Sequence, residues 1–70
     1  MTTSIKIIVN GDTREFDSKN SLDDILRILD LDPRMVVVEH NRSVVRQPQL
    51  ATTLLEDGDS VELVHFVGGG

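Results

Sequence analysis

The chain has 70 residues and a formal net charge of −5, so we expect one small domain with a single modest core and no deep catalytic pocket. The acidity and the presence of only two aromatic residues disfavour binding to nucleic acid, and no apolar run is long enough to span a membrane. The absence of cysteine and of a signal-peptide pattern predicts a cytoplasmic protein.

The chain begins with a pattern typical of a β-hairpin. Residues 4–9 are rich in β-branched side chains and partly alternate, which predicts a first strand. Asn10 and Gly11 follow, and both accept the positive φ angles of a two-residue type I′ turn. A second strand over residues 13–17 would complete a tight antiparallel hairpin.

The clearest helix of the chain begins at Ser21. Its hydroxyl can cap a free backbone N–H, and Asp24 stands three positions later, as in a capping box. Apolar residues then recur at i, i+3, i+4 and i+7, which places them on one stripe of the helix. Pro33 disfavours helical geometry in the residue before it, so we expect about 9 or 10 helical residues. The stripe consists of Leu22, Ile25, Leu26 and Leu29.

The second half of the chain contains three further strand patterns. Residues 35–40 centre on three valines, a short segment over residues 43–45 follows an Asn-Arg turn, and residues 60–67 form a long final strand. Residues 50–55 are ambiguous between a loop and one helical turn. The order is therefore hairpin, helix, strand, short strand and final strand.

One helix with one apolar stripe fits across one face of a four- to five-stranded mixed sheet, which is an α+β fold of the β-grasp type. The first and last strands can then lie side by side in the centre, because the helix supplies the crossover that parallel strands need. We expect a single domain over residues 1–67 and a flexible glycine tail over residues 68–70.

The sequence contains no pattern of a catalytic centre. Nucleophilic catalysis lacks a cysteine, and His40 and His65 are the only histidines, both expected on strands in a hydrogen-bonded or solvated role. Two histidines without suitably spaced carboxylates do not make a metal site, and residues 56–59 are too short for a calcium loop. We therefore expect no catalytic residue and no metal ligand set, and we predict that the chain is not an enzyme.

The glycines at the end of the chain are its most informative feature. Gly68, Gly69 and Gly70 directly follow the patterned final strand. A strip without side chains that ends in a carboxylate can thread a narrow channel in another protein, where the carboxylate can be activated as an acyl-adenylate. The alternative is an idle tail, since chain ends are commonly disordered.

The order of elements and the last fifteen residues together resemble the ThiS family, the ubiquitin-like sulfur carriers of thiamin biosynthesis. The resemblance covers essentially the whole chain. The related MoaD family, the small subunit of molybdopterin synthase, also ends in Gly-Gly, but its members tend to be longer and to carry prolines before the tail. The residues that carry the resemblance most specifically are Asp57-Gly58-Asp59 before the final strand and Val67-Gly68-Gly69-Gly70 after it.

This resemblance implies a chemistry at Gly70. A ThiF-like enzyme would use ATP and magnesium to adenylate the Gly70 carboxylate, and sulfur from a cysteine desulfurase relay would displace AMP, which leaves 1-thioglycine. A ThiG-like thiazole synthase would then receive the sulfur while Gly68 and Gly69 lie in the channel of the partner. The carrier would bind no cofactor itself and would be consumed and recharged.

Strand alternation predicts where such partners dock. Val61 and Leu63 are expected to meet the helix, so Val64 and Phe66 would emerge on the uncovered face of the sheet. Ile8 interrupts the alternation of the first strand and would join them in an exposed apolar cluster. The alternative is that the curl of the sheet or a loop covers these residues.

Three functions stay open at this level. The first is a sulfur carrier for thiazole synthesis, and the second is a carrier for molybdopterin or cysteine biosynthesis or a protein modifier. Both need a free terminal carboxylate, whereas the third, a β-grasp interaction module with an idle tail, does not. Acidic residues near the final strand (Asp57, Asp59 and Glu62) either steer a basic partner or only keep the protein soluble. We expect a monomer in the absence of partners.

Overall fold

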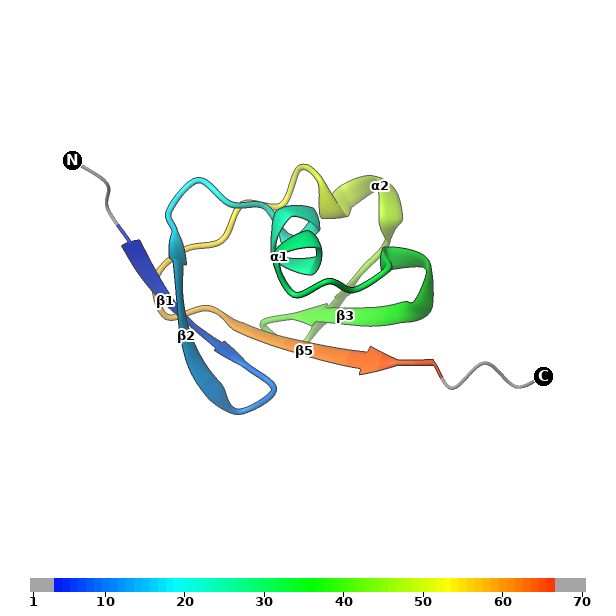
Figure 1. Ribbon diagram of the computed structural model, residues 1–70, viewed down its shortest axis with the longest axis horizontal. Coiled ribbons are helices and arrows are strands. Elements are labelled where there is room, and N and C mark those ends of the chain that lie inside the picture. The colour runs from blue at the N-terminus through cyan, green and yellow to red at the C-terminus, as the bar shows by residue number, and fades with distance from the viewer. Residues whose placement is uncertain (1–3, 67–70) are drawn as a thin grey trace.

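The computed structural model describes residues 4–66, and within that range the chain forms one five-stranded mixed sheet with its helices on one face (Figure 1). The elements are β1 (Ser4–Val9), β2 (Asp12–Asp17), α1 (Leu22–Ile28), the 3₁₀ helix η1 (Pro33–Met35), β3 (Val36–His40), β4 (Ser43–Val45), α2 (Gln47–Leu50) and β5 (Ser60–His65). The strand order β2-β1-β5-β3-β4 confirms the predicted α+β, β-grasp class. Residues 1–3 and 67–70 lie outside the described residues, so the domain boundary at residue 67 and the tail stay predictions.

The first hairpin forms as predicted. Asn10 and Gly11 adopt φ angles of 50° and 87°, the left-handed values that a type I′ turn requires. β1 pairs antiparallel with β2 from Ser4 opposite Asp17 to Val9 opposite Asp12, so β2 begins one residue earlier than predicted.

α1 begins as predicted but is shorter. The Ser21 hydroxyl accepts a hydrogen bond from the Asp24 N–H at 3.1 Å, and the Asp24 carboxylate accepts one from the Ser21 N–H at 3.0 Å, which confirms the capping box. The helix then spans Leu22–Ile28, seven residues, where about 9 or 10 were predicted.

The early end of α1 comes from a left-handed turn at Asp30, whose φ is 61°. The Leu31 N–H donates to the Leu26 carbonyl at 2.8 Å, and the Asp30 N–H donates to the Arg27 carbonyl at 3.1 Å. These two bonds form a Schellman motif, which satisfies carbonyls at the helix end and redirects the chain. The helix length predicted from Pro33 was wrong, because the left-handed turn at Asp30 ends the helix several residues before the proline.

β5 lies in the middle of the sheet. It pairs parallel with β1 and antiparallel with β3, and its Val61 side chain is fully buried. Hydrogen bonding to the β3 side continues past the strand, because the Phe66 N–H donates to the Met35 carbonyl at 2.7 Å. The described chain therefore remains attached to the sheet up to its last residue.

The core lies between the sheet and the helices. Alternate residues of β1, β3 and β5 face α1, and the predicted helical stripe is buried except for Leu29, which is partly buried. Of residues 50–55, which the sequence left ambiguous between a loop and one helical turn, only Leu50 is helical, as the last residue of α2. Pro48 lies in the first turn of α2 and needs no N–H partner. No helix within residues 4–66 has the length and apolarity to cross a membrane. The fully buried large side chains are Ile7, Leu22, Ile25, Leu26, Val38 and Val61.

The β3–β4 hairpin contains a local backbone strain. Asn41 and Arg42 form its two-residue turn with φ angles of 49° and 73°. Asparagine tolerates this region, whereas arginine has a Cβ that approaches the following carbonyl oxygen, at a cost of about 1–2 kcal/mol.

We expect Arg42→Gly to raise the free energy of unfolding by about 0.5–1 kcal/mol, because the relief of strain exceeds the added entropy of the unfolded chain. Urea denaturation at neutral pH measures the change. Arg42→Ala is the control, since it removes the guanidinium but keeps the strained Cβ. Equal stabilisation by both variants would assign the gain to the lost charge and contradict the prediction.

Candidate functional site

The candidate site is the end of β5 and the sheet face around it. Phe66 is the last described residue, and its N–H is fixed to the Met35 carbonyl. Gly68, Gly69 and Gly70 lie outside the described residues, so their roles stay predictions. Within residues 4–66, the site consists of the contacts that hold β5 in place and of the surface around its C-terminal end.

Two asparagine side chains hold β5 along its two edges. On the β1 side, the Asn10 amide group donates to the Leu63 carbonyl at 3.2 Å and accepts from the Leu63 N–H at 2.7 Å. On the β3 side, the side-chain Oδ1 of Asn41 accepts from the Ser60 N–H at 2.9 Å, and the backbone N–H of Asn41 donates to the Ser60 carbonyl at 2.8 Å. Each asparagine thus supplies hydrogen-bonding groups for the backbone of β5 at a point where the neighbouring strand has already turned away.

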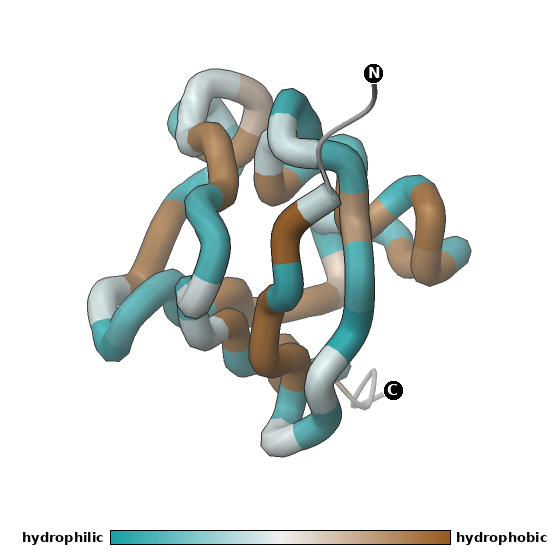
Figure 2. Tube along the Cα trace, turned by 90° about the vertical axis from the view of Figure 1, so that its left-hand side faces the viewer, coloured by the Kyte–Doolittle hydropathy of each residue, from teal (hydrophilic) through white to brown (hydrophobic). Residues whose placement is uncertain are grey.

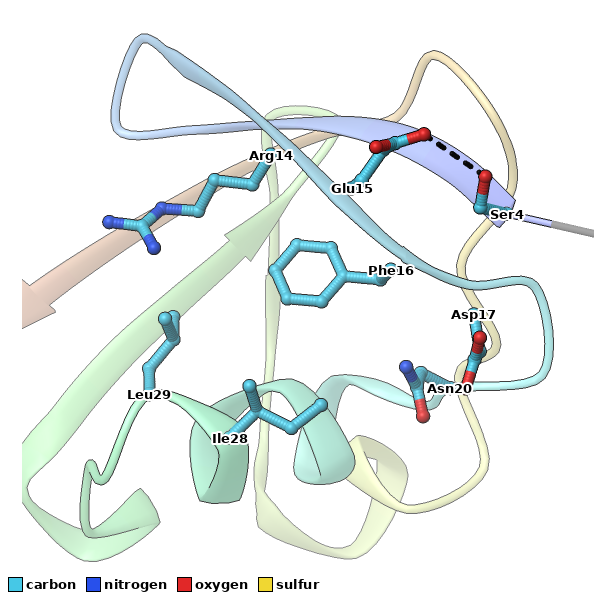
Figure 3. A pocket seen from close by; sticks show the side chains of 8 residues that line it. All are labelled: Ser4, Arg14, Glu15, Phe16, Asp17, Asn20, Ile28 and Leu29. Carbon is cyan, nitrogen blue, oxygen red and sulfur yellow. Dashed lines mark hydrogen bonds between the residues drawn. The ribbon is translucent and has the colours of Figure 1, made fainter.

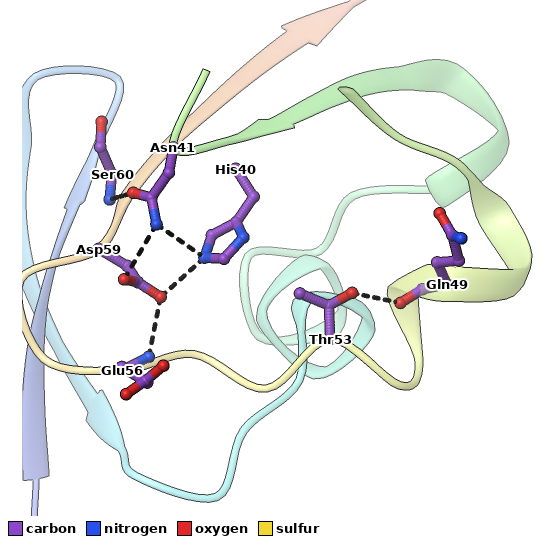
Figure 4. Close-up of polar contacts among 7 residues, drawn as sticks. All are labelled: His40, Asn41, Gln49, Thr53, Glu56, Asp59 and Ser60. Atoms are coloured by element: carbon purple, nitrogen blue, oxygen red, sulfur yellow. Dashed lines mark hydrogen bonds and ion pairs between the residues drawn. The ribbon is translucent and has the colours of Figure 1, made fainter. Parts of the chain in front are cut away.

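A carboxylate at the start of β5 gathers three donors (Figure 4). Asp59 Oδ2 lies 2.7 Å from His40 Nε2 and accepts from the Glu56 N–H at 2.9 Å, while Asp59 Oδ1 accepts from Asn41 Nδ2 at 3.2 Å. The His40 and Asp59 side chains are only 19% and 14% exposed. The hydrogen-bonded role predicted for His40 is confirmed, and His65 is exposed.

The surroundings of Asp59 favour its charged form. Burial by itself raises the pKa of Asp59, but the hydrogen bonds from His40, the Glu56 amide and Asn41 outweigh it and hold the pKa below its usual value. Asp59 is therefore ionised at neutral pH and links the β3–β4 turn to the turn before β5. Within residues 4–66, no three His, Asp or Glu side chains are grouped so as to hold a metal ion.

The outer face of the sheet, opposite α1, is not covered by any described element (Figure 1). Val64 and Phe66 are 54% and 49% exposed on it, and Ile8 is 42% exposed. Ile8 stands opposite Ser60 in the β1–β5 register, four residues before Val64, so it does not form one cluster with Val64 and Phe66. The structure therefore separates the predicted docking residues into two parts.

Two valines that the sequence analysis did not include extend this face. Val37 stands opposite Val64 in the β3–β5 register, and Val44, 55% exposed, stands opposite Glu39 in the β3–β4 register. Alternation could have identified Val37, because it lies between Val36 and Val38, which are both buried in the core.

The three acidic residues near β5 that could steer a basic partner divide into two with a structural role and one on the outer face. Asp59 is engaged in the turn, and the Asp57 carboxylate accepts from the Lys6 N–H at 2.8 Å, so both have a structural role. Glu62 remains on the outer face, where it stands directly opposite Glu39. Within residues 4–66, no basic side chain lies within ion-pair distance of either glutamate. A like-charge pair on neighbouring strands is unfavourable and suits a basic contact from outside.

Residues 7–70 match the model of the ThiS family. The chain is 36% identical over 66 residues to a thiazole synthase of Paramagnetospirillum magneticum, a match that covers 94% of this chain but only 20% of that protein. It is 36% identical over 50 residues to the sulfur carrier protein ThiS of Bacillus subtilis, with 71% of this chain and 76% of that protein covered.

A solved structure agrees with this sequence similarity. The crystal structure of a thiamine biosynthesis protein (ThiS) from Geobacter metallireducens superimposes with a TM-score of 0.80 at 30% identity, and the match covers 94% of this chain and 100% of that one. The chain spans about a fifth of the length of the thiazole synthases that it matches, from Paramagnetospirillum magneticum and Magnetococcus marinus.

We expect Asp59→Asn to lower the free energy of unfolding at neutral pH by about 1–2 kcal/mol, because hydrogen bonds to a charged acceptor are lost. The folded pKa is depressed, so the contribution of Asp59 is fully present above its unfolded pKa and is lost as the pH falls through its folded pKa. The variant should therefore lose less stability than the wild type on acidification.

Urea denaturation at several acidic pH values measures both effects. Asp12→Asn is the matched control, because Asp12 is exposed and has no side-chain hydrogen bond within residues 4–66. Parallel pH profiles for wild type and Asp59→Asn would show that Asp59 does not contribute to the acid dependence.

Proposed function

Because the chain belongs to the ThiS family, whose members include a sulfur carrier protein and a thiamine biosynthesis protein, we propose that it carries sulfur on Gly70 for the thiazole ring of thiamin. A ThiF-like enzyme uses ATP and magnesium to adenylate the Gly70 carboxylate, with release of pyrophosphate. A persulfide from a cysteine desulfurase relay attacks the acyl carbon, and AMP leaves. A thiol then attacks the relay sulfur of the resulting acyl disulfide, which releases the 1-thioglycine thiocarboxylate and leaves the relay sulfur in a disulfide with that thiol.

The observation that carries this proposal is the central position of β5. The chain leaves the middle of the sheet beside an uncovered face, so a partner that docks on this face lies next to the emerging end. Four residues follow Phe66 and span at most about 14 Å when extended. The reacting groups of a partner must therefore lie within that distance of the sheet, with Gly68 and Gly69 in its channel.

The carrier itself contributes binding and no acid–base chemistry. The three donors around Asp59 occupy its carboxylate in the turn, at the opposite end of β5 from Phe66. We expect the partner to supply the electrophilic or nucleophilic machinery, so the carrier is a co-substrate and not an enzyme. Val64 and Phe66 form the docking surface nearest the tail, with Val37 beside them and Ile8 at a separate contact.

The acceptor of the sulfur is proposed to be a ThiG-like thiazole synthase. Two proteins named thiazole synthase contain a segment similar to 94% of this chain within 20% of their own length. In those proteins the ThiS-like segment and the remaining four fifths share one polypeptide, which favours a direct functional relation between the two. This observation favours thiazole synthesis over the molybdopterin and cysteine pathways.

We expect the intact mass of the chain to rise by the replacement of one oxygen by sulfur after incubation with ATP, magnesium, a ThiF-type enzyme and a sulfur donor. Mass spectrometry measures the gain, and a variant that lacks Gly70 should show none if Gly70 is the acceptor. An enzyme that modifies its own carrier in the same mixture is the positive control. No gain under those conditions would overturn the thiocarboxylate proposal.

We expect Phe66→Ala to weaken binding to the ThiF-type enzyme about tenfold, the loss typical of an exposed aromatic anchor at an interface. The backbone bond from Phe66 to Met35 does not depend on the side chain, so stability should change little. Titration calorimetry and urea denaturation check the two statements. Leu54→Ala is the matched control, because Leu54 is 60% exposed and lies outside the sheet. Equal affinities of the wild type and Phe66→Ala would exclude this docking residue.

A further inference from the structure

A hollow of about 570 Å³ is bordered by β2 and the C-terminal end of α1, and no residue of β5 lines it (Figure 3). Phe16 points into it from β2, Ile28 faces it from the last residue of α1, and Leu29 faces it from the cap that follows. Ile28 is 58% exposed although it belongs to the helix that covers the core. The site proposed for sulfur transfer makes no use of this hollow.

β2 is an edge strand, and its free edge borders the hollow. In a two-residue hairpin the closing pair, Val9 and Asp12, exchanges backbone hydrogen bonds, and bonded pairs then alternate along the strands. Thr13 and Glu15 therefore direct their N–H and C=O groups away from β1. No other described strand pairs with this edge.

The opposite edge of the sheet, formed by β4, offers fewer unpaired backbone groups for the addition of a strand. β4 has three residues, whereas β2 has six, the usual length of a strand in a sheet. A long edge with unpaired backbone groups is a template for the addition of another strand. Figure 2 shows that β2 is mostly hydrophilic beside the hydrophobic β1, so its charges protect the edge from indiscriminate pairing.

The charges at this edge specify the complementary side chains. Strand alternation places Thr13, Glu15 and Asp17 on one face of β2 and Arg14 and Phe16 on the other, which faces α1. Glu15 and Asp17 also border the hollow. An added strand would therefore meet the carboxylates of Glu15 and Asp17 on its outer side, and Arg14 with the apolar Phe16 and Ile28 on its inner side. Within residues 4–66, no carboxylate lies within ion-pair distance of Arg14.

From this geometry we propose that the β2 edge and the hollow bind an extended segment of a partner protein that alternates apolar and basic residues. Its backbone pairs with Thr13 and Glu15, its apolar side chains enter the hollow against Phe16 and Ile28, and its basic side chains lie beside Glu15. β1 separates this site from β5, so the segment can bind while the end of the chain is engaged elsewhere.

The test uses a synthetic peptide of about six residues that alternates valine and lysine, with blocked ends. It is titrated into the isotopically labelled full chain and followed by NMR. Saturable shifts at the Thr13 and Glu15 amides, with shifts of the Ile28 methyl signals, are expected. A peptide that alternates valine and glutamate should bind at least tenfold more weakly, because its acids face Glu15. Equal binding of both peptides would overturn the charge argument.

Two variants locate the site. Glu15→Pro removes an N–H that faces away from β1, so it should abolish strand addition while the hairpin stays paired. Ile28→Ser changes an exposed helix position and should weaken binding about tenfold even if the proline variant fails to fold. Val44→Ser, at the other edge of the sheet, is the matched control and should bind as the wild type does.

The remaining outcomes are equally decisive. Absence of saturable shifts at millimolar peptide, shifts confined to the outer face around Val64, or Ile28 shifts without Thr13 and Glu15 shifts would each overturn the proposal. Ile28→Ser should leave the mass gain at Gly70 unchanged, so failure of this proposal and failure of the sulfur-carrier proposal are distinguishable.

Discussion

The pairing of β5 between β1 and β3 is the constraint on which the rest of the structure depends. Val61 is fully buried because β1 and β3 flank its strand on either edge and its side chain belongs to the core that the sheet shares with α1. Because β1 and β5 are parallel neighbours, the chain between them must cross over one face of the sheet. The helices α1 and α2 lie on that face. The same constraint leaves the other face open and makes the C-terminal end of the sheet's central strand the exit of the chain.

Side chains, and not only the strand ladder, keep β5 in this place. β1 contributes only a short parallel pairing, Ile8 with Ser60 and Val9 with Val61, before the chain turns at Asn10. The Asn10 amide then continues the hydrogen bonding to Leu63, and Asn41 does the same for Ser60 on the other edge. Two turn residues therefore position the strand that delivers the chain end.

Sequence reasoning identified every strand and the main helix because these depend on local pattern: the alternation in β1, the apolar stripe of α1 and the Asn-Gly turn. Sequence reasoning failed for features that depend on contacts between residues far apart in the chain. The asparagine clamps join residues separated by 53 and 19 positions, and only the sheet register brings those residues together. The end of α1 was missed for a different reason, because a left-handed Asp30 is less visible in a sequence than a glycine would be.

The outer face keeps features that a protein selected for stability alone would lose. Glu39 and Glu62 stand opposite each other without a cation in the described chain, and Val64 and Phe66 stay about half exposed although the same fold buries equivalent side chains on its other face. Such a surface costs the free chain some stability. Under the proposed function, a partner that covers Val64 and Phe66 and places a basic group beside the two carboxylates compensates for this cost. The two faces of one sheet therefore differ: the helical face holds the fold together, and under the proposed function the outer face receives a partner beside the end of β5.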